Sequence, residues 1–147
     1  MLFRISNCLQ QPSYISLQTA LSFYQFIPEG VYLYQAVSTN PTVLYATPAG
    51  SFQYRTVKPA FYFGYRILRK EQYPVLLAEP EKALLDFFYL TPALRSTQDM
   101  EALRLNPTAI TETINWDLLQ HYTEIFQSKT VDKRVNWLKK IIHANPI

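Results

Sequence analysis

The period of the hydrophobic pattern changes near the middle of this 147-residue chain. Up to about residue 78 the apolar residues mostly alternate with polar ones, which predicts strands. From residue 80 onward they recur every three or four residues, which predicts helices. A chain that segregates strands and helices in this way favours an α+β fold over alternating βαβ units. We therefore expect an N-terminal helix and a mainly antiparallel sheet of about five strands, followed by a helical C-terminal half.

The N-terminal helix is predicted over residues 17–25, where Ser16 is a suitable N-cap and Pro28 stops the helix. The predicted strands span residues 31–39, 43–47, 51–57, 61–68 and 73–78. The segment Pro48-Ala49-Gly50 predicts a tight hairpin between the second and third of them. Because glycine weakens a strand interior, Gly64 in the fourth predicts a bulge or a close backbone contact.

Four helices are predicted in the second half, over residues 81–90, 98–105, 116–127 and 131–143. Pro80 suits the first turn of the first helix. The N-caps are predicted at Ser96 or Thr97 for the second helix, Asn115 for the third and Thr130 for the fourth. Apolar side chains at helical spacing predict the buried face of the last helix, which consists of Val131, Val135, Leu138 and Ile142.

The length fits a single domain over residues 1–147, with a sheet-rich core at 13–92 and a helical part at 93–147. With one cysteine, Cys8, no intramolecular disulfide forms, and the N-terminus lacks the apolar region of a signal peptide. No stretch approaches the length of apolar residues that a membrane span needs. We therefore expect a cytoplasmic protein without a membrane partner. The sequence predicts no oligomeric state.

Histidine, cysteine and glycine are too few and too scattered for familiar catalytic or cofactor motifs. His121 and His143 are both distant from Cys8 in the sequence, so neither a Cys–His pair nor a zinc signature is indicated. Three isolated glycines do not make a phosphate-binding loop. We therefore expect no catalytic residue, no metal ligand and no cofactor, and a protein that is not an enzyme.

One acidic cluster, formed by Glu79, Glu81, Lys82 and Asp86, has the composition of a metal-dependent nuclease site. The acid-any-Lys spacing of that class of nuclease is missing, because Pro80 and Glu81 separate Glu79 from Lys82. We interpret the cluster as a helix start with acidic residues at the positive end of the helix dipole, followed by a solvated Lys82–Asp86 pair.

Basic residues predict two candidate surfaces in a chain of net charge +3. The first is a basic sheet face that carries Arg55, Lys58 and Arg66. The second is the last helix, where Lys133 and Lys140 lie away from the apolar stripe, and Arg134 and Lys139 flank it. Each is either a solvated face or a surface that docks an anion, RNA or an acidic protein.

Four segments occur in a characteristic order along the first part of the chain. They are residues 14–22 (YISLQTALS) with 27–29 (IPE), residues 47–55 (TPAGSFQYR) with 57–59 (VKP), residues 61–65 (FYFGY) and residues 78–86 (AEPEKALLD). In this order and spacing they resemble the C-terminal domain of AbiEi-family antitoxins, over roughly residues 13–92. Gln25 stands where the family has a glycine.

The resemblance implies an antitoxin of an AbiE-type, type IV toxin–antitoxin pair, which protects bacteria from phage by abortive infection. Such an antitoxin counteracts a nucleotidyltransferase-like toxin without necessarily forming a stable complex with it. Family members usually carry an N-terminal winged helix-turn-helix that represses their own operon. Only about a dozen residues precede the matching part here, so operator binding by this chain alone is not expected.

The resemblance also carries over particular residues. Arg55 and Lys58 match an Arg-any-any-Lys-Pro stretch. Arg55 lies on the polar side of its predicted strand, so we expect it to be exposed and to contact a partner. Glu81, Lys82 and Asp86 match the Pro-Glu-Lys-Ala helix, where they either bind a partner or only cap and pair on the surface. Two alternatives to the antitoxin remain. One is a nucleic-acid-binding or transcription-regulatory module, and the other is a diverged nuclease-like domain that depends on Glu79 or Asp86.

Overall fold

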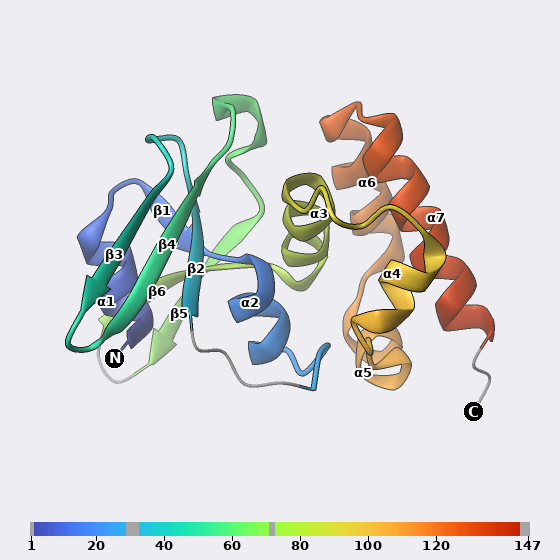
Figure 1. The fold of residues 1–147 in the computed structure, drawn as a ribbon, viewed down its shortest axis with the longest axis horizontal. Coiled ribbons are helices and arrows are strands. Elements are labelled where there is room, and N and C mark those ends of the chain that lie inside the picture. The colour runs from blue at the N-terminus through green and yellow to red at the C-terminus, as the bar shows by residue number, and fades with distance from the viewer. Residues whose placement is uncertain (1, 29–32, 71–72, 145–147) are drawn as a thin grey trace.

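A computed structural model describes residues 2–28, 33–70 and 73–144. A six-stranded sheet lies between a short N-terminal helix and a large helical half (Figure 1). The helices are α1 Leu2–Leu9, α2 Leu17–Phe23, α3 Pro80–Leu90, α4 Thr97–Ala102, α5 Pro107–Thr113, α6 Trp116–Phe126 and α7 Lys129–Ala144. The strands are β1 Ser13–Ile15, β2 Leu33–Ser38, β3 Val43–Thr47, β4 Gly50–Thr56, β5 Tyr65–Lys70 and β6 Tyr73–Ala78. The predicted α+β class, with sheet and helices segregated, is confirmed.

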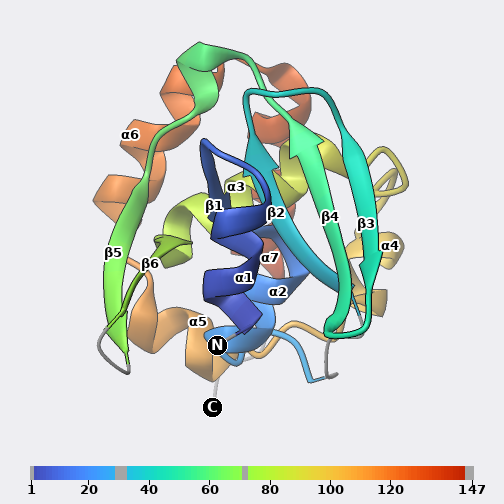
Figure 2. The same ribbon diagram turned by 90° about the vertical axis from the view of Figure 1, so that its left-hand side faces the viewer.

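The strands of the sheet run in the order β3-β4-β2-β1-β6-β5, as Figure 2 shows face-on. The β1–β2, β3–β4 and β5–β6 contacts are antiparallel, whereas β2–β4 and β1–β6 are parallel. The sheet is therefore mixed and has six strands rather than five. The additional strand, β1, has only three residues, all of them buried, so it shows no alternation that would reveal it in the sequence.

The predicted strands at 43–47 and 73–78 are confirmed, and the predicted strand at 51–57 is shifted by one residue. The prediction for 61–68 is wrong at its start, because Pro59–Phe61 form a 3-10 turn and β5 begins only at Tyr65. Strand β5 also extends two residues beyond the predicted end, to Lys70. Residues 71–72, and residues 31–32 of the first predicted strand, lie outside the described residues.

The helix predictions hold best where an N-cap is clear. Asn115 caps α6 and Ser96 caps α4, each through a side-chain oxygen that accepts a backbone N–H. The cap predicted at Thr130 is wrong: α7 already begins at Lys129, and the Ser128 hydroxyl accepts the N–H of Val131. Neither α1 nor α5 is predicted, although neither is shorter than α2 or α4.

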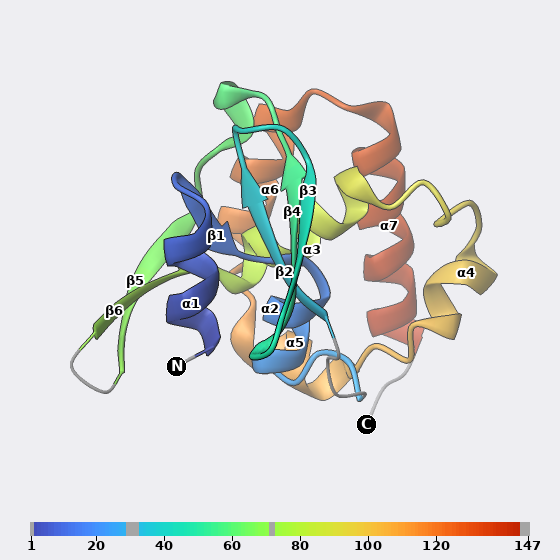
Figure 3. The same ribbon diagram turned by 60° about the vertical axis from the view of Figure 1, so that its left-hand side comes forward.

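The elements stack in layers, seen in Figures 1 and 3. Helix α1 lies on one face of the sheet, while α2 and α3 lie on the other, and α4 to α7 surround the far side of α3. Helix α3 is thus the centre of the molecule, and every residue from Pro80 to Phe88 is buried. Among the described residues, no helix combines the length and apolar character that crossing a bilayer requires.

Candidate functional site

Helix α3 carries three charged residues into the interior. Glu81, Lys82 and Asp86 are 4%, 0% and 0% exposed. An ionised side chain without partners is very unfavourable in such a place, so each of the three needs compensating charge or hydrogen bonds. The structure supplies them from elements that are far apart in the sequence.

The centre of this arrangement is the pair of Lys82 and Asp86, one helical turn apart. The Lys82 Nζ donates to Asp86 Oδ1 at 2.7 Å, to the Tyr14 hydroxyl at 2.8 Å and to the Phe61 carbonyl oxygen at 2.8 Å. Because an ammonium group has three N–H bonds, all of its donors are used. On the other side of the carboxylate, Oδ2 accepts from the hydroxyls of Tyr14 and Ser16, both at 2.8 Å.

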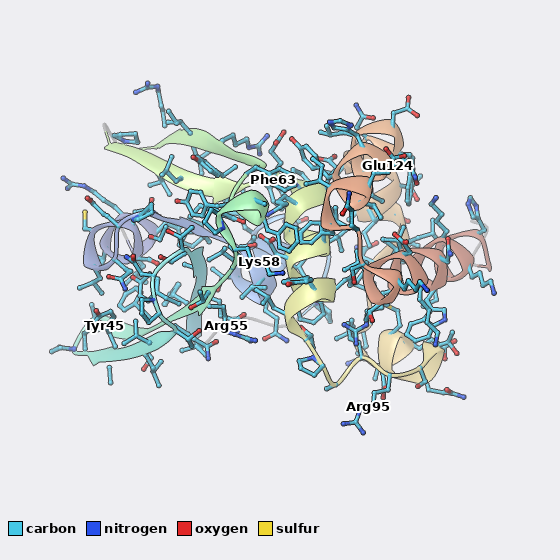
Figure 4. All side chains as sticks on the ribbon, turned by 90° about the horizontal axis from the view of Figure 1, so that it is seen from above. Tyr45, Arg55, Lys58, Phe63, Arg95 and Glu124 are labelled. Carbon is cyan, nitrogen blue, oxygen red and sulfur yellow. The ribbon has the colours of Figure 1, made fainter. Side chains whose placement is uncertain are left out.

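Aromatic rings enclose the Lys82 ammonium group. Its Nζ lies 4.4 Å from the ring centre of Phe63, 5.3 Å from that of Tyr14 and 5.4 Å from that of Phe126. These distances allow cation–π attraction, which is stronger where water is excluded. Figure 4 shows Phe63 between the sheet and α6, beside α3.

Gly64 passes directly over the stem of Lys82. A Cβ at this position would lie 2.8 Å from Lys82 Cγ, and the residue has φ +75°, a conformation that favours glycine. The close backbone contact predicted from the sequence at Gly64 is therefore confirmed.

Burial shifts the acid–base equilibria of this cluster. It raises the pKa of Asp86 and lowers the pKa of Lys82, and the attraction between the two groups opposes both shifts. The pKa of the Tyr14 hydroxyl is raised well above its ordinary value, mainly by burial and then by the adjacent Asp86 carboxylate. We call these four residues, Tyr14, Ser16, Lys82 and Asp86, the buried network.

The remaining acids of the predicted cluster attach α3 to α6. Glu81 accepts the backbone N–H of Asn115 at 2.8 Å, and Glu79 accepts the hydroxyl of Tyr122 at 2.7 Å. Asn115 is the N-cap of α6, so Glu81 fixes the residue at which that helix starts. Both carboxylates therefore position the helical half against α3.

The predicted solvated Lys82–Asp86 pair is wrong, because both side chains lie at 0% exposure. The sequence does contain a signal for burial of Lys82 and Asp86. Leu85 and Tyr89 lie on the same side of the helix as these two charged residues, at helical spacing. A helix that is apolar all around is buried on all sides.

Two arginines meet the C-terminal end of α3. Arg55 donates to the Leu90 carbonyl at 3.0 Å, and Arg134 donates to the carbonyls of Phe88 and Leu94, the latter at 3.0 Å. Cations are favourable there because the last carbonyls of a helix carry partial negative charge. Arg55 is half-buried, whereas the sequence predicts an exposed side chain. Arg134, which is predicted to flank the apolar stripe of α7, is only 6% exposed.

The basic sheet face predicted from Arg55, Lys58 and Arg66 does not form one patch. Arg55 lies on β4 and Arg66 on β5, and three strands separate them in the sheet. At the usual strand spacing this distance is roughly 19 Å. Lys58 is exposed with its Nζ 5.9 Å from the Phe61 ring centre, and the Arg66 guanidinium lies 5.5 Å from the ring centre of Tyr24.

Helix α7, in contrast, does present an ordered basic surface. Its predicted apolar face, Val131, Val135, Leu138 and Ile142, is buried. Exposed cationic or titratable side chains recur on the opposite side at Lys129, Lys133, Lys140 and His143. These positions follow a spacing of four, seven and three residues, so they lie in one line roughly 21 Å long. We call them the α7 stripe.

Within the described residues, no three side chains among His, Cys, Asp and Glu are grouped to hold a metal ion. No protein-family model matches the sequence, and no curated protein or solved structure is significantly similar to it.

Proposed function

We propose that this chain is a non-enzymatic antitoxin domain of an AbiE-type pair that works in the cytoplasm and counteracts a nucleotidyltransferase-like toxin. One observation carries the proposal: all four segments that resemble the AbiEi family contribute to the surroundings of α3. They supply Tyr14 and Ser16, then Arg55, then the Phe61 carbonyl and Gly64, and finally Lys82 and Asp86.

These matching residues are the ones on which this fold depends. The pair of Lys82 and Asp86 needs the Tyr14 hydroxyl, and the stem of Lys82 needs the absence of a side chain at Gly64. Because the residues that carry the resemblance lie together around α3, the resemblance concerns the three-dimensional arrangement rather than the composition of the chain. It therefore supports descent from the same kind of domain.

The network itself has a positioning role in this proposal. Its charges are sealed from solvent and fully hydrogen-bonded, so they hold α3 against the sheet rather than meet a partner. Contact with the toxin falls to the surface, and the α7 stripe is the basic surface that the fold assembles from neighbouring positions. Lys133 and Lys140, which belong to this stripe, are the contact residues that we propose.

Co-expression with a nucleotidyltransferase-like toxin, to be sought among the neighbouring genes, tests the proposal. We expect the wild-type protein to restore growth and Lys133→Glu/Lys140→Glu to restore much less. The matched control is Arg66→Glu/Arg69→Glu, which makes the same charge change at exposed positions on β5 and should rescue like the wild type. Circular dichroism and urea unfolding confirm that each variant folds.

Absence of rescue by a folded wild-type protein would contradict the antitoxin function. Rescue by the wild type and by both double variants would support the antitoxin but reject the α7 stripe as its contact surface.

The α7 stripe also favours a second candidate, a nucleic-acid-binding module. Three lysines and a histidine in a line suit a phosphate backbone, and phosphate contacts release counterions when they form. Fluorescence anisotropy with labelled RNA and DNA should then give a logarithmic salt slope of about −2 to −3 if the three lysines contact phosphates. A slope near zero, or no change in Lys133→Glu/Lys140→Glu, would reject this candidate.

The diverged nuclease is the least supported alternative. It requires a carboxylate that is free to bind a metal ion, but both oxygens of Asp86 already accept hydrogen bonds from Lys82, Tyr14 and Ser16. Glu79 is engaged by Tyr122. The remaining test is direct: cleavage that requires a divalent metal and disappears in Glu79→Gln would revive it.

A further inference from the structure

The two edges of the sheet differ in how they meet solvent. In the described part of the chain, β3 pairs only with β4, and β5 only with β6, so each has one unpaired side. An edge strand offers free N–H and C=O groups to any further strand, and proteins usually guard such edges with charges. Figure 2 shows β3 and β5 at opposite ends of the sheet.

The edge strand β5 carries charged side chains, whereas the edge strand β3 carries none. Exposed Arg66 and Arg69 lie on β5. Strand β3 consists of Val43, Leu44, Tyr45, Ala46 and Thr47, none of which is charged, and Leu44 is 58% exposed. The absence of charge extends well beyond the strand, because residues 30–54 contain no Asp, Glu, Lys, Arg or His.

We propose that β3 pairs antiparallel with β3 of a second copy of this chain, so that two sheets join across a two-fold axis. An antiparallel pair of identical strands is related by such an axis, which makes the strand its own complement. Near the axis each residue faces the same residue or its neighbour in the other copy. A charged side chain there would therefore lie close to the same charge in the other copy and be repelled by it. The uncharged stretch removes that repulsion from a chain whose net charge is +3.

On both faces of the sheet, the side chains of β3 suit pairing with a second copy of the chain. Val43 and Tyr45 are half-buried and extend a small apolar cluster of Ala36, Phe52 and Tyr54 that α1 covers. The Tyr45 and Tyr54 rings lie 5.8 Å apart, edge to face. In Figure 4 Tyr45 lies at the end of the molecule away from the helical half, so α3 to α7 do not obstruct a second copy. Leu44 and Ala46 are exposed on the other face.

A charged partner has little to recognise at this edge, which favours a second copy over an acidic or basic protein. A five-residue strand contact is smaller than a standard protein interface, so we expect reversible dimerisation at micromolar to millimolar concentration. Because the interface holds no charge, the association should not weaken in salt. This inference does not depend on the antitoxin proposal.

Sedimentation equilibrium from about 10 µM to about 1 mM tests the dimer. The mass of the wild type should rise from 17.2 kDa toward twice that value, with no decrease at high salt. Leu44→Lys should remain monomeric at every concentration. Ile67→Lys is the matched control, since Ile67 is 54% exposed on β5 and the change is the same. It should dimerise like the wild type.

Cysteine cross-linking locates the contact independently. In a Cys8→Ser background, Leu44→Cys should form an intermolecular disulfide on oxidation and Ile67→Cys should not. A wild type that stays at 17.2 kDa throughout would overturn the proposal. Dimerisation that survives Leu44→Lys, or cross-linking at position 67 instead of 44, would also overturn it, since each places the contact elsewhere.

Discussion

Lys82 and Asp86 form an ion pair with 2.7 Å between Nζ and Oδ1, and neither side chain is exposed to solvent. A buried pair of this kind adds little stability compared with apolar residues of the same shape, but breaking it leaves a charge that nothing compensates. In this protein the pair also joins α3 to β1 through Tyr14 and to the 3-10 turn through Phe61. It therefore acts as a constraint on the fold.

Replacing Lys82 alone should strongly destabilise the folded protein. Lys82→Met should lower the free energy of unfolding by about 3–5 kcal/mol, because Asp86 stays buried without its counter-charge. The double variant Lys82→Met/Asp86→Asn leaves no uncompensated charge at these two positions and should be more stable than the single one. Urea unfolding of both proteins measures the difference. A loss below about 1 kcal/mol in the single variant would mean that Asp86 is protonated or solvated.

Arg134 should matter to stability far more than its neighbour in sequence. Arg134→Met removes donors from two buried carbonyls, those of Phe88 and Leu94, and should cost about 2–3 kcal/mol. Lys133→Met, one residue away on the exposed side of α7, should stay within about 0.5 kcal/mol of the wild type. Equal effects of the two changes in thermal unfolding would show that Arg134 is not bound as described.

Gln25 should be replaceable by glycine with a gain in stability. It has φ +64°, and the bonds from its own N–H to Ser22 and from the Phe26 N–H to Leu21 make a Schellman ending of α2. Glycine is favoured at this position, so Gln25→Gly should stabilise the protein by about 0.5–1 kcal/mol.

The same change at Gln120, an exposed residue inside α6, provides the control. Gln120→Gly should destabilise by about 1 kcal/mol, because glycine is a poor helix former. If both changes destabilise equally, position 25 does not have the left-handed conformation.

The tyrosines should make the protein sensitive to alkali. Burial raises the pKa of Tyr24, Tyr62 and Tyr122 to about 12, and hydrogen bonding to Glu79 adds to the shift of Tyr122. Between pH 10 and about 12 the unfolded chain loses these protons while the folded protein keeps them. The folded state then binds more protons, so the free energy of unfolding falls as the pH rises through this window.

Urea unfolding at a series of pH values measures this decline, and tyrosinate absorbance follows the ionisation itself. Tyr122→Phe should reduce both the slope and the delayed absorbance. An identical delay of tyrosinate absorbance in the wild type and in Tyr122→Phe would contradict the prediction for Tyr122.

The sequence predicted much of the local structure because local structure depends on neighbours in the chain. Asn115 and Ser96 mark helix starts through their own side-chain oxygens, and the spacing of Val131, Val135, Leu138 and Ile142 sets the buried face of α7. Alternation predicts β3, and the same rule fails at residues 61–64, where Phe61 ends a 3-10 turn and supplies its carbonyl to Lys82. A long-range contact overrides the local pattern there.

The chain by itself determined its α+β class, the N-caps at Ser96 and Asn115, and the exposure of Lys133 and Lys140, since each follows from periodicity or from a single side chain. Only the tertiary structure decided that Lys82 and Asp86 are buried, because their partners come from β1 and a turn about 70 and 20 residues away. It also decided that Arg55 and Arg66 lie far apart, because the order of strands depends on parallel contacts that no local pattern encodes. Those parallel contacts form because several apolar faces are buried at the same time, and these faces come from segments along the whole chain.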